Sequence, residues 1–265
     1  MSIITDRYGK RAPENAERQS PEPLSFYGSP VPETGSSGTA PDNGIPVEKH
    51  PWQPFIPDGA KVLMLGSFPP KKERWSMDFF YPNFNNDMWR IIGIVFFGDK
   101  DRFIAKCGIP GSGGVAQPVK RFDKDGIIRF CSERGLALYD TAYEVRRLKD
   151  NASDRFLEIV APVDIRKLLH VMPECRAVVT TGEKAGEAVA AQLGCRIPKP
   201  GCHTDVVLPS DGQRACPPDE GRMIRFFRLP SSSRAYPLSL ERKAEAYSVL
   251  KTLLDTGYAE HSEKK

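Results

Sequence analysis

Three short runs of consecutive apolar residues predict buried strands. They lie in residues 60–68 (AKVLMLGSF), 136–142 (LALYDTA) and 176–182 (RAVVTTG). Apolar residues at nearly every position, rather than at alternate positions, are typical of strands in a parallel sheet that is covered on both faces. A further pair of strands is expected in residues 203–209 (HTDVVLP) and 222–233 (RMIRFFRLPSSS).

Segments with apolar residues at helical spacing separate these runs. Asn85 or Asn86 is expected to cap a helix that begins near Met88 and carries one apolar face. Further helices are expected from Asp125 to Gly135, in residues 163–172 and 183–194, and in residues 240–257 after a Ser239 cap. The alternation of strands and helices predicts an α/β sandwich with a largely parallel sheet.

The two ends of the chain differ from this pattern. Residues 1–48 are rich in Pro, Gly and Ser and have few apolar residues, so we expect a disordered tail. The folded domain is expected in residues 49–258, and residues 259–265 are expected to be a flexible C-terminus.

Composition narrows the function classes. The net charge of +4 and the pI of 8.7 permit a nucleic-acid partner without requiring one. No apolar run is long enough to span a membrane and the first residues lack an apolar signal core, so we expect a cytoplasmic protein without a membrane partner. The cysteines have no CxxC spacing, and Cys195, Cys202, His203 and Cys216 are too irregularly spaced for a structural zinc site, so no metal is expected.

The loop after the first strand has an unusual composition. Residues 66–87 combine Gly-Ser-Phe-Pro-Pro, a run of four charged residues at 71–74, three consecutive aromatic residues at 79–81 and an Asn-Asn-Asp run before a helix. In parallel α/β sheets, ligands bind beyond the carboxyl ends of the strands. This loop and the loops after the other strands are therefore expected to meet at one rim and to line a pocket.

Four motifs at these strand ends resemble one known family. They are GSFPP (66–70), YPNFNNDMW (81–89), LYDTAYEVRRLKDNASD (138–154) and LPSSSRAYPLSLERK (229–243). In their order and spacing they resemble the uracil-DNA glycosylase superfamily, and most of all its branch of hypoxanthine-DNA and mismatch-specific glycosylases. The resemblance covers residues 60–255. It implies a three-layer α/β/α sandwich with a central, mostly parallel four-stranded sheet.

The resemblance also implies a function. It indicates a DNA repair glycosylase that hydrolyses the N-glycosidic bond of a flipped-out deaminated base, hypoxanthine or uracil, in damaged DNA. Enzymes of this kind extrude the target base and read its edge by hydrogen bonds and stacking. No cofactor is implied, and we expect a monomer.

Within the motifs, Asn86 is the first candidate for reading the base edge or orienting the attacking water, because its amide both donates and accepts. Asp87 is a candidate general base, and Ser67 completes the expected catalytic group. Asn86 has an alternative role as a helix cap, and both roles can hold together. The residues expected to contact the base are Gly66, Phe68, Phe79 and Tyr81. Phe79 would stack on the base, or it is an ordinary core residue.

The last motif would grip the DNA backbone. Hydroxyls and backbone N–H groups suit phosphates, which position a strand without reading its sequence. The expected DNA-binding residues are Ser231, Ser232, Ser233, Arg234, Tyr236, Lys71 and Lys72. Either Arg234 or Tyr236 would wedge into the duplex where the base leaves. The alternatives are a Ser-rich turn before the last helix and, for the lysines, a solvated loop.

Two positions depart from the superfamily pattern. Many members carry Asp or Asn where this chain has Phe68, and many uracil-specific members carry His where it has Leu229. In the hypoxanthine-type branch the first position is also apolar, and the Asn aligned with Asn86 serves instead. These departures leave a second interpretation open, namely a catalytically silent DNA- or nucleotide-binding relative of the same fold.

Overall fold

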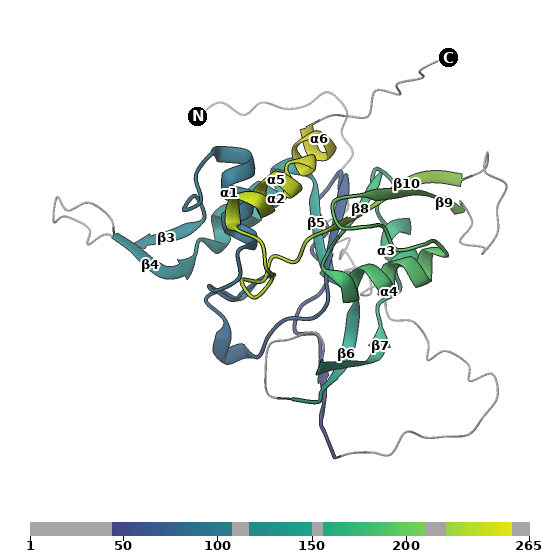
Figure 1. The fold of residues 1–265 in the computed structure, drawn as a ribbon, viewed down its shortest axis with the longest axis horizontal. Helices are drawn as coiled ribbons and strands as arrows, with labels where there is room; N and C mark the ends of the chain where they lie inside the picture. The colour runs from purple at the N-terminus through teal and green to yellow at the C-terminus, as the bar shows by residue number, and fades with distance from the viewer. Residues whose placement is uncertain (1–43, 108–116, 150–155, 210–220, 256–265) are drawn as a thin grey trace, which may run out of the picture.

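The computed structural model describes residues 44–107, 117–149, 156–209 and 221–255. Its centre is a five-stranded sheet with the strand order β5-β2-β8-β10-β9 (Figure 1). The strands are β2 (Val62–Gly66), β5 (Leu136–Asp140), β8 (Ala177–Thr181), β9 (His203–Pro209) and β10 (Gly221–Leu229). Every residue of β2, β5 and β8 is buried, as their continuous apolar sequences predict.

The expected strand number of four was wrong. Strands β5, β2, β8 and β10 run parallel to one another, and β9 pairs antiparallel with β10 as the fifth strand. The sheet is therefore mixed. The parallel part still brings the carboxyl ends of β2, β5, β8 and β10 to the same edge.

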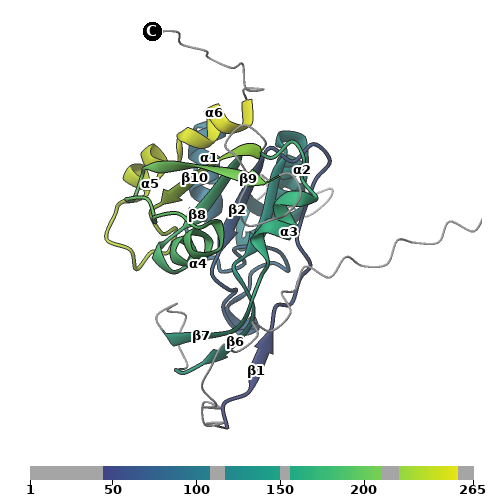
Figure 2. The ribbon, with the colours of Figure 1, turned by 90° about the vertical axis from the view of Figure 1, so that its right-hand side faces the viewer.

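Helices cover both faces of the sheet (Figures 1 and 2). One face carries α1 (Met88–Phe97), α2 (Lys124–Arg134), α5 (Leu240–Tyr247) and α6 (Val249–Asp255). The other carries α3 (Ile165–His170) and α4 (Glu183–Leu193). The layers are those of an α/β/α sandwich. No helix among the described residues has both the length and the apolar character needed to cross a membrane.

The helix ends follow local capping rules. The Asp123 side chain accepts a hydrogen bond from Gly126 N–H, so α2 begins at Lys124, one residue before the expected Asp125. It ends at Arg134, and Gly135 follows as a left-handed C-cap. Ser239 caps α5 as expected. The expected single C-terminal helix is divided at Ser248 into α5 and α6.

Two small sheets were not expected from the sequence. One is a three-stranded antiparallel sheet of β1 (Val47–Lys49), β6 (Ala142–Arg147) and β7 (Leu157–Pro162) below the end of β5. The other pairs β3 (Ile104–Cys107) with β4 (Gln117–Phe122), two strands that the pattern of apolar residues did not predict. A short 3-10 helix, η1 (Lys72–Arg74), lies in the loop after β2.

The expected domain limits are only partly covered by the structure. Residues 1–43 of the expected tail and residues 256–265 of the expected C-terminus lie outside the described residues. The last residues of the expected tail are already in β1, which starts at Val47 and pairs with β6.

Candidate functional site

A cavity of about 730 Å³ lies at the carboxyl ends of the parallel strands. Its walls come from the loop after β2, the end of β5, the end of β8 and the loop after β10. Of the expected site residues, those that line it are Gly66, Ser67, Phe68, Tyr81, Asn86, Ser231, Ser232, Ser233, Arg234 and Tyr236. The sequence motifs thus meet at one edge of the sheet. The volume lies in the range of small-molecule sites.

The floor of the cavity is built around Gly66, the last residue of β2. A Cβ atom at this position would lie 2.3 Å from Asp140 Oδ1 and 3.4 Å from the Tyr81 hydroxyl oxygen. Only glycine at this position therefore leaves room for the Asp140 carboxylate beside the strand end. The Tyr81 hydroxyl also hydrogen-bonds with Thr181 Oγ1 at 3.2 Å, and Tyr81 has a left-handed backbone with φ of 52°.

Asp140 has a buried partner that the sequence motifs do not include. His50, just after β1, donates from Nε2 to Asp140 Oδ2 at 2.9 Å. The His50 side chain is fully buried and that of Asp140 is 9% exposed. The sequence could not suggest this pair, because the two residues are 90 positions apart and an isolated histidine carries no pattern.

The position of Asn86 is compatible with both expected roles, as a helix cap and as a group that contacts the base or the water. Its Oδ1 accepts a hydrogen bond from Met88 N–H at 2.9 Å, which caps the first turn of α1 although Asp87 is the N-cap residue. Its Nδ2 has no hydrogen-bond partner among the described residues, and the side chain lines the cavity. A backbone bridge to Ser233 fixes Asn86 against the loop after β10.

The Asp87 carboxylate is bound to two cationic side chains and does not face the cavity. Its Oδ1 accepts from Arg234 Nε at 2.9 Å and its Oδ2 from Lys243 Nζ at 3.0 Å. It does not line the cavity, and Lys243 is 1% exposed. Because both carboxylate oxygens are bound to cations, this geometry favours an anchoring role and not the expected role as general base.

The loop that carries Ser231, Ser232 and Ser233, called the serine loop below, is held in place by hydrogen bonds. The buried Tyr247 hydroxyl donates to the Pro230 carbonyl at 2.7 Å, and burial raises the pKa of Tyr247 well above its ordinary value. Ser232 is buried, and its carbonyl accepts from Asp87 N–H. The Ser231 and Ser233 hydroxyls accept backbone N–H groups within the loop. The loop is therefore preformed.

The aromatic residues divide between the core and the cavity. Phe79 is 8% exposed, packs against Phe55 and Phe80 and does not line the cavity, so the structure favours its role as a core residue over the expected stacking role. Phe68, Tyr81 and Tyr236 supply the aromatic surface of the cavity instead. Leu229 is fully buried.

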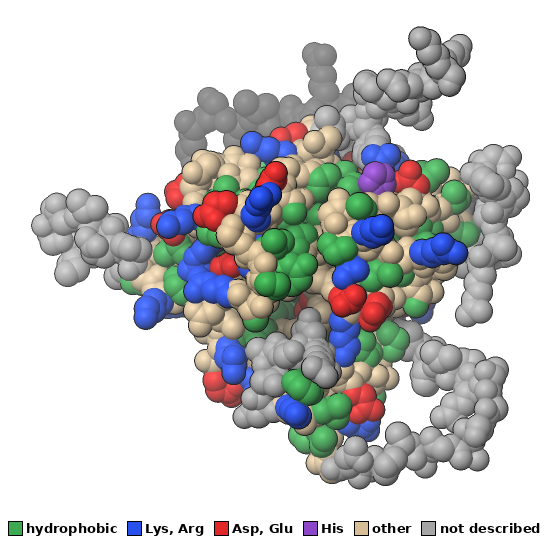
Figure 3. Space-filling view, viewed as in Figure 1, with side chains coloured by type: hydrophobic (Ala, Val, Ile, Leu, Met, Phe, Trp, Pro, Cys, Tyr) green, Lys and Arg blue, Asp and Glu red, His purple; other side chains and the backbone are tan. Residues whose placement is uncertain are grey.

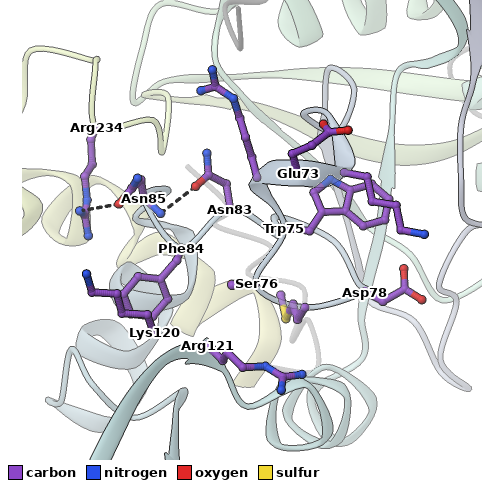
Figure 4. A pocket seen from close by; sticks show the side chains of 13 residues that line it. Glu73, Trp75, Ser76, Asp78, Asn83, Phe84, Asn85, Lys120, Arg121 and Arg234 are labelled. Carbon is purple, nitrogen blue, oxygen red and sulfur yellow. Dashed lines mark hydrogen bonds between the residues drawn. The ribbon is translucent and has the colours of Figure 1, made fainter.

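A second hollow of about 1030 Å³ adjoins the cavity and shares Arg74, Asn83, Asn85 and Arg234 with it (Figure 4). We call it the basic groove. Its remaining lining residues include Lys72, Glu73, Trp75, Asp78, Phe84, Lys120 and Arg121. Figure 4 shows Arg234 bound to Asn85, which in turn donates to Asn83. Lys120 and Arg121 lie on β4, a strand that was not predicted from the sequence.

The groove carries more positive than negative charge. Five of its lining residues are Lys or Arg and two are Glu or Asp. Lys71 is exposed beside it but lines neither hollow. Figure 3 shows Lys and Arg side chains on the part of the surface where β3 and β4 lie.

Arg90 supports the groove from below. It packs over the Phe84 ring at 4.4 Å and donates to the Phe84 carbonyl at 2.8 Å. Burial, and next the charge of Arg234, lower the pKa of Arg90 from its ordinary value. The guanidinium therefore fixes the turn between Asn83 and Asn86.

Among the described residues, no three His, Cys, Asp or Glu side chains are grouped as a metal site. Cys216, one of the four residues weighed as metal ligands, lies outside the described residues.

No protein-family profile matches the chain, and no curated protein matches it. Among solved structures, the chain is similar to a solution NMR structure from Methanosarcina acetivorans that is described as a "putative Uracil DNA glycosylase". The sequence identity is 18% and the TM-score is 0.47, over 78% of this chain and 98% of that chain. A functional proposal for this chain therefore rests on the residues of its own site.

Proposed function

We propose that the protein is a DNA repair glycosylase that hydrolyses the N-glycosidic bond of a flipped-out deaminated base, hypoxanthine or uracil. The observation that carries the proposal is the meeting of four strand-end motifs around one cavity, with a basic groove that opens beside it. The cavity has the size for a base and its sugar. The groove has the charge for the strand that carries them.

The reaction requires few protein groups. A water oxygen bonds to C1′ as the N-glycosidic bond breaks, the base leaves with the bonding electrons and takes up a proton, and an abasic site remains. The positive charge that develops on the sugar and the negative charge on the base need fixed dipoles nearby. Asn86 Nδ2 is a donor on the cavity wall for an oxygen of the base.

The other walls suit the rest of the nucleotide. Phe68 and Tyr81 offer aromatic surface for the base. In the serine loop, the hydroxyls of Ser231 and Ser233 can donate to a phosphate oxygen while they accept backbone N–H groups within the loop, and Arg234 adds charge at the border of cavity and groove. Lys72, Arg74, Lys120 and Arg121 continue the positive charge along the groove, and would bind flanking phosphates.

The catalytically silent DNA- or nucleotide-binding relative remains the second candidate. It is favoured by Phe68, where many superfamily members carry Asp or Asn, and by Asp87, whose carboxylate is bound to Arg234 and Lys243. Both candidates require the cavity and the groove. They differ only in whether the base is released.

Single-turnover assays with labelled oligonucleotides test the proposal. Each oligonucleotide contains one hypoxanthine, uracil or xanthine, either single-stranded or opposite each normal base. Abasic sites that form with hypoxanthine or uracil support the glycosylase. Binding without base release supports the silent relative, and neither binding nor release contradicts both.

A further inference from the structure

His50 lies outside the four motifs but reaches the site. It follows β1, in a segment that precedes the core strands. Its imidazole is enclosed by the rings of Phe68, Phe80, Tyr139 and Trp52, with ring centroids 4.7 to 6.1 Å away. A ring enclosed in this way has little freedom to turn, so its nitrogens have fixed directions.

Both ring nitrogens are engaged. Nδ1 lies 2.8 Å from the Trp52 carbonyl oxygen and 3.2 Å from the Trp52 backbone nitrogen. Nε2 lies 2.9 Å from Asp140 Oδ2. Because an ionised carboxylate can only accept, Nε2 carries the proton of this bond. His50 thereby holds one oxygen of Asp140 in place.

The other oxygen of Asp140 lies beside Gly66, and both residues line the cavity. Asp140 Oδ1 has no hydrogen-bond partner among the described residues, and it lies directly against the α-carbon of Gly66. The side chain is more than nine-tenths buried and lines the cavity. A carboxylate buried to this degree is costly unless its oxygens accept hydrogen bonds. A donor from the occupant of the cavity fits this need.

We propose that His50 is a positioning residue for the reaction, which fixes the Asp140 carboxylate so that Oδ1 accepts a hydrogen bond from an O–H or N–H group in the cavity. This inference rests on the proposed glycosylase function. The donor is either the attacking water or a ring N–H of the deaminated base. Asp140 would then supply a fixed hydrogen-bond acceptor. The side chain of Phe68, where many superfamily members carry Asp or Asn, cannot supply one.

A purely structural role is the competing explanation. The His50–Asp140 bond also ties β1 to the end of β5, and its loss would lower stability in either case. A structural role leaves the rate per folded molecule unchanged. A positioning role changes the rate or the affinity for substrate in molecules that are still folded.

The experiment compares His50→Gln with His50→Leu in the full chain, under single-turnover conditions with deoxyinosine and deoxyuridine oligonucleotides. Gln can place its Nε2 donor near the position of the imidazole Nε2, whereas Leu fills the space without a donor. We expect His50→Leu to lose about tenfold or more in rate or affinity, in keeping with a lost hydrogen bond to a charged group. His50→Gln should retain more of both.

Asp140→Asn is the second variant, which keeps the size of the side chain if His50→Leu does not fold. A fall in the rate at saturating enzyme identifies water as the donor, and a weaker affinity with an unchanged rate identifies the base N–H. Folded His50→Leu and Asp140→Asn with wild-type rate and affinity would overturn the inference alone. A wild-type protein that releases no base, whether or not it binds DNA, would overturn the proposed function together with it.

Discussion

The α-carbon of Gly66 and the carboxylate of Asp140 are in direct contact at the ends of two neighbouring strands. Gly66 ends β2, Asp140 ends β5, and the two residues are paired in the parallel register. A Cβ atom on Gly66 would lie 2.3 Å from Asp140 Oδ1. Gly66 therefore leaves the space that the Asp140 carboxylate occupies. Among the described residues, Asp140 is the only Asp or Glu that lines the cavity.

Replacing Gly66 with Ala should therefore displace the Asp140 carboxylate. His50 holds the other carboxylate oxygen, so the side chain cannot simply rotate away. A displacement of about 1 Å at a reacting group can reduce the rate about 100-fold. We expect base release to fall by that order while the far-ultraviolet circular dichroism stays native. A Gly66→Ala protein with the wild-type rate would show that this carboxylate does not take part.

Asn86 offers a substitution that separates capping from function. Asn86→Asp keeps an oxygen that accepts the Met88 N–H but removes the Nδ2 donor, so stability should change by less than ~0.5 kcal/mol while base release is lost. Asn86→Ala removes both groups and should also destabilise the fold by about 1 kcal/mol. Urea unfolding and single-turnover rates distinguish the two effects. Equal rates for wild type and Asn86→Asp would leave Asn86 as a cap alone.

Asp87, Lys243 and Arg234 should contribute very unequally to stability. Lys243→Met leaves the buried Asp87 carboxylate without its buried partner, a change expected to cost about 3–5 kcal/mol. The Arg234 side chain is 47% exposed, so Arg234→Ala should cost at most about 1 kcal/mol but should weaken DNA binding. Chemical denaturation measures both. Similar unfolding free energies for the two variants would contradict the anchoring role of the Lys243–Asp87 pair.

If the basic groove binds DNA, replacing its cationic side chains should change the salt dependence of DNA binding. If Lys120 and Arg121 each contact a phosphate, the slope of log Kobs against log salt should decrease in magnitude by about 0.7 to 0.9 for each residue replaced by Ala. Lys251→Ala on α6 is the matched control, because Lys251 is exposed and lines neither hollow. The same slope for all three variants and wild type would place the DNA elsewhere.

The layers of the fold could be predicted because their signals are local. Continuous apolar runs identified β2, β5 and β8, and Gly135 and Gly194 ended their helices in left-handed C-caps as expected. The small sheets could not be predicted in the same way. β1 pairs with β6 almost 100 residues later, and the short, polar β4 depends on β3 for its form.

The candidate site was predicted in its position but not in its details. The rule for carboxyl ends of parallel strands placed Ser67, Asn86 and the serine loop on one cavity, as the geometry now has them. Which side chains point into the cavity depends on packing that the sequence does not express. Phe79 is buried in the core, and Asp87 is bound to Lys243. His50, which lies outside the motifs, is bound to Asp140.

The most direct test of the proposed function is the detection of the released base itself. Full-length protein in excess is incubated with oligonucleotides that contain hypoxanthine or uracil, and the products are separated and weighed by mass spectrometry. We predict free base in amounts equal to the abasic strand, and none from the undamaged oligonucleotide. Intact damaged strand after saturating binding would contradict the glycosylase and leave a protein that binds DNA without cutting the glycosidic bond.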